Sequence, residues 1–147
     1  MAFGPDPPKL QVHLCVSNGT AAIAFYERAF GATCTMKQLA PDGVRVLHAN
    51  LVLFGSEVML QDAFPEWSPD VLPPDARGGA SMTISINLPQ PGDVDAALQR
   101  AGTAGAWVTL AAADMFWGAR YGRLRDPSGH VWAFNAPLGL KKDGSTT

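Results

Sequence analysis

Residues 10–32, LQVHLCVSNGTAAIAFYERAFGA, contain the unit on which the fold depends. Apolar residues alternate with Gln11, His13 and Cys15 over residues 10–16, and side chains alternate between the two faces of an extended chain. This pattern predicts a strand with one apolar face and one polar face.

A helix is predicted directly after this strand. Ile23, Tyr26 and Phe30 recur at helical spacing, so they share one apolar face. The polar cluster at 17–20 can cap the start of the helix, and Gly31 can end it in a left-handed turn. A strand followed by a helix is therefore the start of the fold.

Three more strands follow this helix, at residues 32–39, 44–53 and 57–61. Together these elements form a first βαβββ module over residues 9–62. The next segment, 63–79, holds four prolines and no apolar periodicity, as expected of a connector.

The second half of the chain repeats this plan over residues 80–137. Asp93 is the expected cap of its helix, and Gly102 and Gly105 are expected to close it. A polar tail covers residues 138–147. The predicted class is α+β, with two βαβββ modules whose mixed, curved sheets enclose a cleft. The strands of the second module are predicted at 81–88, 106–111, 119–125 and 130–135.

The composition limits which classes of partner the protein is expected to bind. With 147 residues and 47% hydrophobic residues, the chain can bury a core. A formal charge of -2 gives no reason to expect nucleic acid, and no apolar stretch reaches the ~20 residues that span a bilayer. Cys15 and Cys34 fall in predicted strands, and the amino terminus lacks a secretion signal. We therefore expect a cytoplasmic protein.

Three stretches resemble the vicinal oxygen chelate superfamily of glyoxalase, bleomycin resistance and dioxygenase proteins. They are AIAFYERAFGA at 22–32, VLHANLVLFGSEVMLQD at 46–62 and WGARYGRLRDPSGHVWAF at 117–134. They are most similar to its PhnB-like branch. The resemblance implies a homodimer, and the long connector would permit modules to be swapped between subunits.

The resemblance also implies four metal-ligand positions, on the cavity faces of the first and last strands of each module. They fall on Gln11, on Met59 or Gln61, on Ser81 and on Ala133. A serine hydroxyl is a poor ligand for a divalent transition metal, and alanine offers no donor atom. We therefore expect no metal cofactor at the usual site. The alternative is a divalent metal at a relocated site.

That relocated site would use His13, His48 and Glu57, because two histidines and one carboxylate suit a catalytic metal. His130 follows a predicted Asp-Pro-Ser-Gly turn at 126–129 and shares a face with Trp132 and Phe134. We expect it to be a packing residue rather than a metal ligand.

In the preferred interpretation, the protein has a polar ligand-binding cleft and no metal site. No catalytic residue is assigned. The protein would bind a small organic molecule, as in antibiotic resistance by sequestration. The alternatives are a metal-dependent lyase, isomerase or dioxygenase with a shifted ligand set, and a scaffold without a ligand. Arg120 or Arg123 could anchor an anionic ligand. The predicted cleft residues are Gln11, His13, His48, Asn50, Gln61, Ser81, Thr83, Trp117 and Arg120.

Overall fold

The structure, a computed structural model, describes residues 9–139; most of the predicted tail at 138–147 lies outside these residues. Two four-stranded sheets are present, each with one helix, and this confirms the predicted α+β class with two βαβββ modules. Sheet A has the strand order β1-β4-β3-β2 and sheet B the order β5-β8-β7-β6. The elements are β1 (Val12–Val16), α1 (Gly19–Phe30), β2 (Thr33–Leu39), β3 (Val46–Leu53), β4 (Ser56–Asp62), the short 3-10 helix η1 (Pro74–Arg77), β5 (Thr83–Asn87), α2 (Pro91–Ala104), β6 (Trp107–Asp114), β7 (Ala119–Arg125) and β8 (Val131–Pro137).

The first helix begins and ends where the sequence predicts. Asn18 is its N-cap, and the side-chain Oδ1 accepts a hydrogen bond from the backbone N–H of Ala21 at 3.0 Å. Gly31 ends the helix with a φ of 67°, a left-handed conformation that glycine adopts without steric cost. No helix of the described residues is long and apolar enough to cross a membrane.

The predicted cap of the second helix is wrong. α2 begins at Pro91, two residues before Asp93, and Gln90 is its N-cap. Asp93 lies in the first turn, where its carboxylate accepts from the backbone N–H of Gln90 at 3.0 Å, as in a capping box. Gly105 closes the helix, whereas Gly102 lies within it.

Each sheet has one face against the helices and one open face. In both sheets the edge strand that begins the module pairs in parallel with the strand that ends it, and the other pairs are antiparallel. Leu14 and Leu60 are buried on the helix side of sheet A, whereas His13 and Glu57 are exposed on the other side. Alternation along the strands therefore defines the open face of each sheet.

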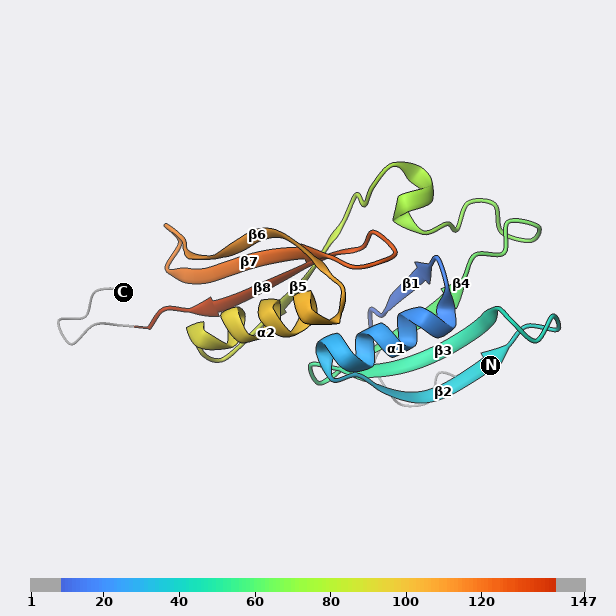
Figure 1. Cartoon of the computed structure of the whole chain (residues 1–147), viewed down its shortest axis with the longest axis horizontal. Coiled ribbons are helices and arrows are strands. Elements are labelled where there is room, and N and C mark those ends of the chain that lie inside the picture. Colours follow the sequence, from blue (N-terminus) through green and yellow to red (C-terminus); the bar gives the residue numbers. More distant parts are fainter. Residues whose placement is uncertain (1–8, 140–147) are drawn as a thin grey trace.

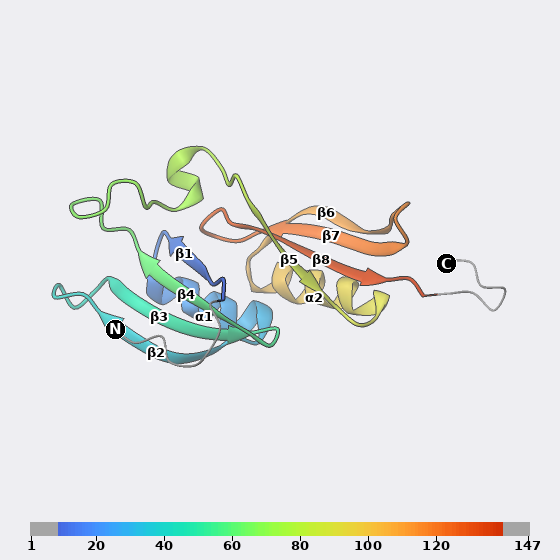
Figure 2. The same ribbon diagram turned by 180° about the vertical axis from the view of Figure 1, so that it is seen from behind.

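The two modules share one hydrophobic core. α1 and α2 lie next to each other in the middle of the molecule (Figure 1), and the view from behind shows the sheets in front of the helices (Figure 2). Phe30 of α1 packs against Trp132 and Phe134 of β8, with ring centroids 4.8 and 5.9 Å apart. These contacts join the halves through the faces that carry the helices.

The Asp-Pro-Ser-Gly turn fastens the second module to the first. The buried Asp126 carboxylate accepts from Tyr26 Oη at 2.5 Å and from Trp132 Nε1 at 2.9 Å. The Ser128 hydroxyl accepts from the backbone N–H of Ser17 at 3.0 Å. His130 Nε2 donates to the carbonyl of Cys15 at 2.7 Å. This bond ties the start of β8 to β1, and a structural role for His130 stays the prediction that it supports.

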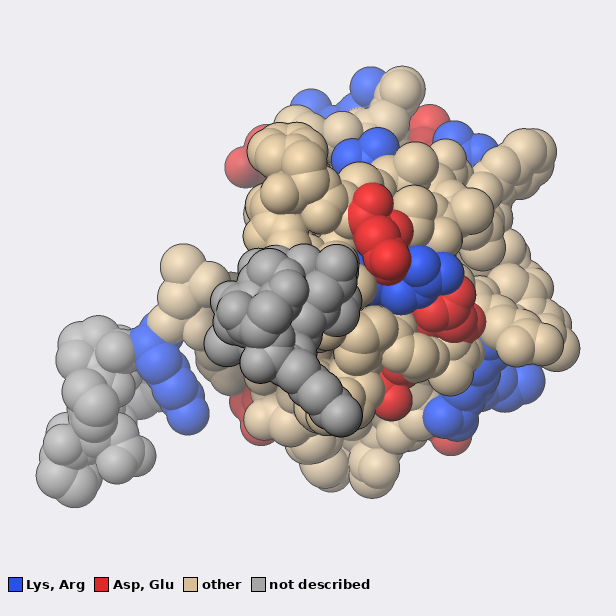
Figure 3. All heavy atoms as spheres, turned by 90° about the vertical axis from the view of Figure 1, so that its left-hand side faces the viewer, with Lys and Arg blue, Asp and Glu red and all other residues tan. Residues whose placement is uncertain are grey.

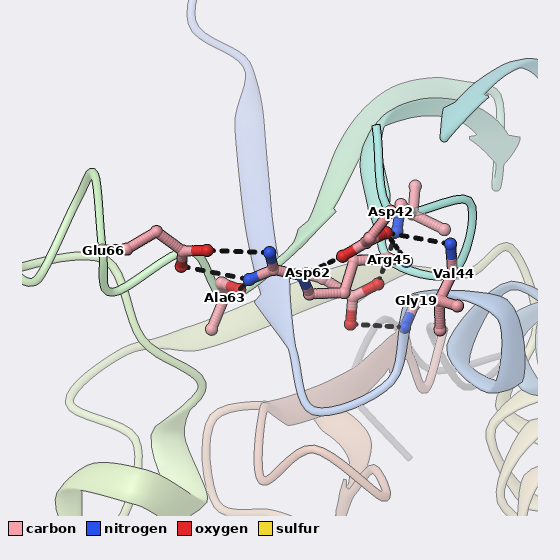
Figure 4. A network of polar contacts seen from close by, with 8 residues as sticks. Gly19, Asp42, Val44, Arg45, Asp62, Ala63 and Glu66 are labelled. Carbon is pink, nitrogen blue, oxygen red and sulfur yellow. Dashed lines mark hydrogen bonds and ion pairs between the residues drawn. The ribbon is translucent and has the colours of Figure 1, made fainter. Parts of the chain in front are cut away.

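A second buried carboxylate positions the start of α1. Asp62, at the end of β4, accepts from the backbone N–H groups of Gly19 and Val46 at 2.8 and 2.7 Å (Figure 4). Beside it, Arg45 bridges Asp42 of the β2–β3 turn and Glu66 of the connector, each at 2.7 Å. The end of sheet A next to the β2–β3 turn is thereby joined to the start of α1 and to the connector.

Candidate functional site

The open face of sheet A brings together most of the polar residues predicted to line the cleft. The register places His13 beside Met59 and Met59 beside Asn50, so these residues form a row across three strands. His48 lies in the next row, with its ring centroid 5.5 Å from that of His13, and its Nε2 is hydrogen-bonded to Asn50 Oδ1 at 2.8 Å.

Burial and charge favour the neutral form of one of these imidazoles. Partial desolvation lowers the pKa of His13 below its usual value, and the neighbouring His48 lowers it further. At neutral pH His13 can therefore offer either a ring N–H donor or a free ring nitrogen to a ligand.

This pairing predicts how His13 titrates. The His13 resonances should titrate below pH 6.5, and in a His48→Gln variant the midpoint should rise because one like charge is gone. It should stay below 6.5, since desolvation is the larger cause. Proton and carbon NMR of the ring as a function of pH measures both midpoints. An unchanged His13 midpoint in the variant would show that the rings do not interact electrostatically.

Gln11 and Glu57 form a separate pair at the edge of this face. Gln11 Nε2 donates to Glu57 Oε1 at 2.9 Å. Both line a hollow of about 300 Å³ that also includes Phe54, Ser85 and Asn87, so residues of both modules enclose it. Gln61 lies further along β4, beside Cys15 in the register, and its amide donates to the carbonyl of Asp62 at 3.2 Å.

The open face of sheet B carries hydroxyl, amide, aromatic and guanidinium groups. One row runs from Ser85 through Ala133 to Arg123, and the next from Asn87 through Asn135 to Tyr121. Thr83 lies on the same face of β5, beside Val131 in the register, and is exposed.

Two other predicted cleft residues lie near the ends of sheet B. Trp117, in the turn before β7, donates from Nε1 to Asn135 Oδ1 at 3.2 Å. Ser81 lies just before β5, in a separate hollow of about 170 Å³ that includes Met82 and His130. The structure therefore brings Trp117 to the open face and places Ser81 toward the connector.

Arg120 lies apart from the other predicted cleft residues. In the register it is beside Ala136, on the side of sheet B that packs against α2. Its guanidinium binds Asp95 of α2 at 2.7 Å and Asp114 of β6 at 2.9 Å. Arg123 instead lies on the open face, beside Ala133. Arg120 is thus already paired with two carboxylates, whereas Arg123 is available to a ligand.

The surroundings of Cys15 disfavour its nucleophilic thiolate form at neutral pH. Burial, with a smaller effect from Asp62, raises the pKa of its thiol to about 11, so the thiolate is scarce. The thiol donates to the carbonyl of Val71 in the connector at 3.6 Å. Cys15 is therefore part of the packing between sheet A and the connector.

The donor groups present do not fit the metal that the fold family implies. Of the four positions, Ala133 offers no donor atom and is 0% exposed, and Ser81 offers only a neutral hydroxyl. The relocated set is divided, because His13 and His48 contact each other while Glu57 is paired with Gln11. Within residues 9–139, no group of three or more His, Cys, Asp or Glu side chains is arranged to hold a metal ion.

Several residues of this site were not predicted from the sequence. Arg125 and Trp107 are neighbours in the register and share the open face of sheet B, with the guanidinium carbon 5.4 Å from the ring centroid. Asn135 holds the Trp117 ring. The alternation along β7 was the available signal, because it places Tyr121, Arg123 and Arg125 on one face.

Comparison with known proteins agrees with this architecture. A family model of the Glyoxalase/Bleomycin resistance protein/Dioxygenase superfamily matches residues 10–134. An uncharacterized protein of Mycobacterium bovis is 40% identical over 132 residues, covering 89% of this chain and 84% of that protein.

Solved structures share the fold. TioX from Micromonospora sp. ML1 superposes with a TM-score of 0.64 at 25% identity, covering 92% of this chain and 100% of that one. The fosfomycin resistance protein FosX from Listeria monocytogenes has a TM-score of 0.64 at 15% identity, covering 88% and 90% of the two chains. Since the family model spans nearly the whole chain, the protein belongs to the Glyoxalase/Bleomycin resistance protein/Dioxygenase superfamily.

Proposed function

We propose that this protein binds a small organic molecule on the open faces of its sheets and does so without the divalent metal of its enzymatic relatives. It would belong to the PhnB-like, bleomycin-resistance-like members of the superfamily. Sequestration of an antibiotic would then give resistance without any chemical step.

The row that contains Ala133 carries this proposal. A fully buried alanine, Ala133, occupies the position where the family resemblance implies a metal ligand, and its neighbour in the register is Arg123. A guanidinium is always positively charged, so it disfavours a divalent cation nearby. The same row offers hydrogen-bond donors to an organic ligand from Ser85 and Arg123.

The open faces also support the proposal of a homodimer. Large apolar side chains are exposed on them, including Met36 at 40% and Trp107 at 67%. A second copy could cover sheet A of one subunit with sheet B of the other and enclose a cleft, with or without module swapping. Size-exclusion chromatography with light scattering reports the mass directly.

Charge supports a small ligand rather than a polyanion. Acidic and basic side chains lie next to each other on a largely uncharged surface at one end of the molecule (Figure 3). The chain has a formal charge of -2, so long-range attraction to nucleic acid is absent.

Titration calorimetry against a panel of planar antibiotics tests the function. We expect at least one compound to bind, with an affinity that dialysis against EDTA leaves unchanged. Replacing Asn50 or His13 by alanine should weaken binding about fivefold, because each substitution removes a hydrogen-bonding group worth ~1 kcal/mol. Glu27→Gln, on the exposed side of α1, is the control. Absence of heat with every compound, from folded protein, would reject the proposal.

A metal-dependent lyase, isomerase or dioxygenase is the second candidate, and the contact between His13 and His48 favours it. Neutral imidazoles bind divalent metals, and the lowered pKa of His13 keeps that ring neutral. Elemental analysis of purified protein separates the two candidates. Stoichiometric metal that is lost in His13→Ala and His48→Ala variants would support the enzyme.

A further inference from the structure

Two arginines on the open face of sheet B each lie over an aromatic ring. The guanidinium carbon of Arg123 is 5.9 Å from the ring centroid of Tyr121, and that of Arg125 is 5.4 Å from the ring centroid of Trp107. Both arginines are exposed. Because they are two residues apart on one strand, their side chains project from the same face.

These two positive charges have no acidic partner in the part of the chain that the structure describes. The ion pairs found there engage Arg45 and Arg120, each with two carboxylates. The register rows of this open face contain no Asp or Glu. Their members are Thr83, Val131, Arg125 and Trp107, then Ser85, Ala133, Arg123 and Leu110, then Asn87, Asn135, Tyr121 and Ala113.

Two tryptophans on this face are exposed, and one of them, Trp117, is held in place. Trp107 is 67% exposed and Trp117 is 50% exposed. Trp117 is fixed by its hydrogen bond to Asn135 and by an edge-to-face contact with Tyr121, with centroids 5.4 Å apart. A ring that is already ordered offers contact area to a flat ligand at little entropic cost.

We infer that the open face of sheet B binds a planar aromatic carboxylate. The guanidinium of Arg123 or Arg125 would take the carboxylate in a two-pronged hydrogen bond, and the aromatic body would stack on one exposed tryptophan, either Trp107 beside Arg125 or Trp117 beside Tyr121. Ser85 and Asn87 supply neutral donors on the next strand but one. This inference rests on the proposed function, since it names the class of molecule that the site takes.

Single-stranded nucleic acid is the less suitable occupant. Surfaces that bind it carry positive charge along a groove that follows several nucleotides. On the described open face of sheet B, the unpaired positive charge lies at two positions of β7, Arg123 and Arg125, on a chain with a net charge of -2.

The test compares 2-naphthoate with 2-naphthamide, which has the same shape and no charge. Calorimetry should show the acid binding about tenfold more tightly than the amide, as expected for one charge-assisted bond. Arg123→Gln and Arg125→Gln should reduce or abolish this preference, and Arg123→Lys should retain part of it. Arg120→Gln, on the same strand and the opposite face, is the matched control and should keep the full preference.

Each other outcome overturns the inference. Equal affinity for the two compounds, no binding of either, or unchanged preference in both glutamine variants would do so. If a ten-nucleotide oligothymidylate displaced naphthoate, and its binding depended on Arg123, the face would be assigned to nucleic acid. A changed oligomeric mass in Arg123→Gln, with naphthoate affinity unaltered, would assign it to a second copy. The His13 and Asn50 variants lie on sheet A, so antibiotic binding that depends on them would leave the proposed function intact even if sheet B bound neither naphthalene compound.

Discussion

Replacing Asp126 by alanine should lower the free energy of unfolding by about 3–5 kcal/mol, the cost of leaving a buried polar network without its charged member. The carboxylate is 3% exposed and accepts four hydrogen bonds. Two come from the side chains of Tyr26 and Trp132, and two from the backbone N–H groups of Ser128 and His130. Alanine would leave all four donors without that acceptor in a site that water does not reach.

Urea unfolding followed by circular dichroism measures the loss. Asp70→Ala is the matched control, because Asp70 is an exposed aspartate of the connector and its removal should change stability by less than ~0.5 kcal/mol. Should the alanine variant fail to fold, Asp126→Asn provides a milder case, since one oxygen remains while an amide N–H₂ faces the donors. Asp126→Ala within ~1 kcal/mol of the wild type would contradict this account.

Tyr26→Phe separates the link between modules from the turn itself. Tyr26 lies in α1, whereas the other three donors to Asp126 belong to the second module. Losing the hydroxyl should cost about 1–2 kcal/mol. The double variant Tyr26→Phe, Asp126→Ala should lose less stability than the sum of the two single losses, because both substitutions remove the same hydrogen bond.

Local patterns were sufficient to predict the elements of this fold. Alternation of apolar residues predicted the strands, and helical spacing of Ile23, Tyr26 and Phe30 predicted α1 within one turn. These signals are local, because a strand or a helix presents its buried face at a fixed period. The start of α2 was misjudged because Asp93 suits both an N-cap and the third position of a capping box.

The contacts between modules could not be read from such patterns. Asp126 looked like a turn residue, and its partner Tyr26 lies 100 positions away. Arg120 was assigned to the cleft, yet Asp95 of α2 holds it on the opposite face. A side chain that points toward a helix or toward a ligand has the same sequence period in both cases, so only the register distinguishes them.

Replacing Gly19 by alanine should cost about 3 kcal/mol, near the upper end for overpacking a buried site. A Cβ atom there would lie 2.5 Å from Asp62 Oδ2 and 2.6 Å from Val46 Cγ2. Both distances are far inside van der Waals contact. The start of α1 would have to move away from β3, and the hydrogen bond from the Gly19 N–H to Asp62 would be stretched.

Gly92→Ala is the matched control for this prediction. Gly92 lies in the first turn of α2, and an added Cβ would meet no atom within 4 Å. Alanine is the better helix former, so this variant should be equally stable or more stable by up to about 1 kcal/mol. Thermal unfolding of both variants in parallel gives the comparison.

A double variant identifies the cause of the Gly19→Ala loss. Val46→Ala removes the methyl groups nearest to the new Cβ, so it should recover part of the lost stability when combined with Gly19→Ala. The clashes with Asp62 Oδ2 at 2.5 Å and with the Cβ of residue 46 at 2.7 Å would remain, and the recovery should therefore be small. If the two losses simply add, the steric explanation fails. The glycine would then matter through the backbone conformation at the start of α1 and not through the space between helix and sheet.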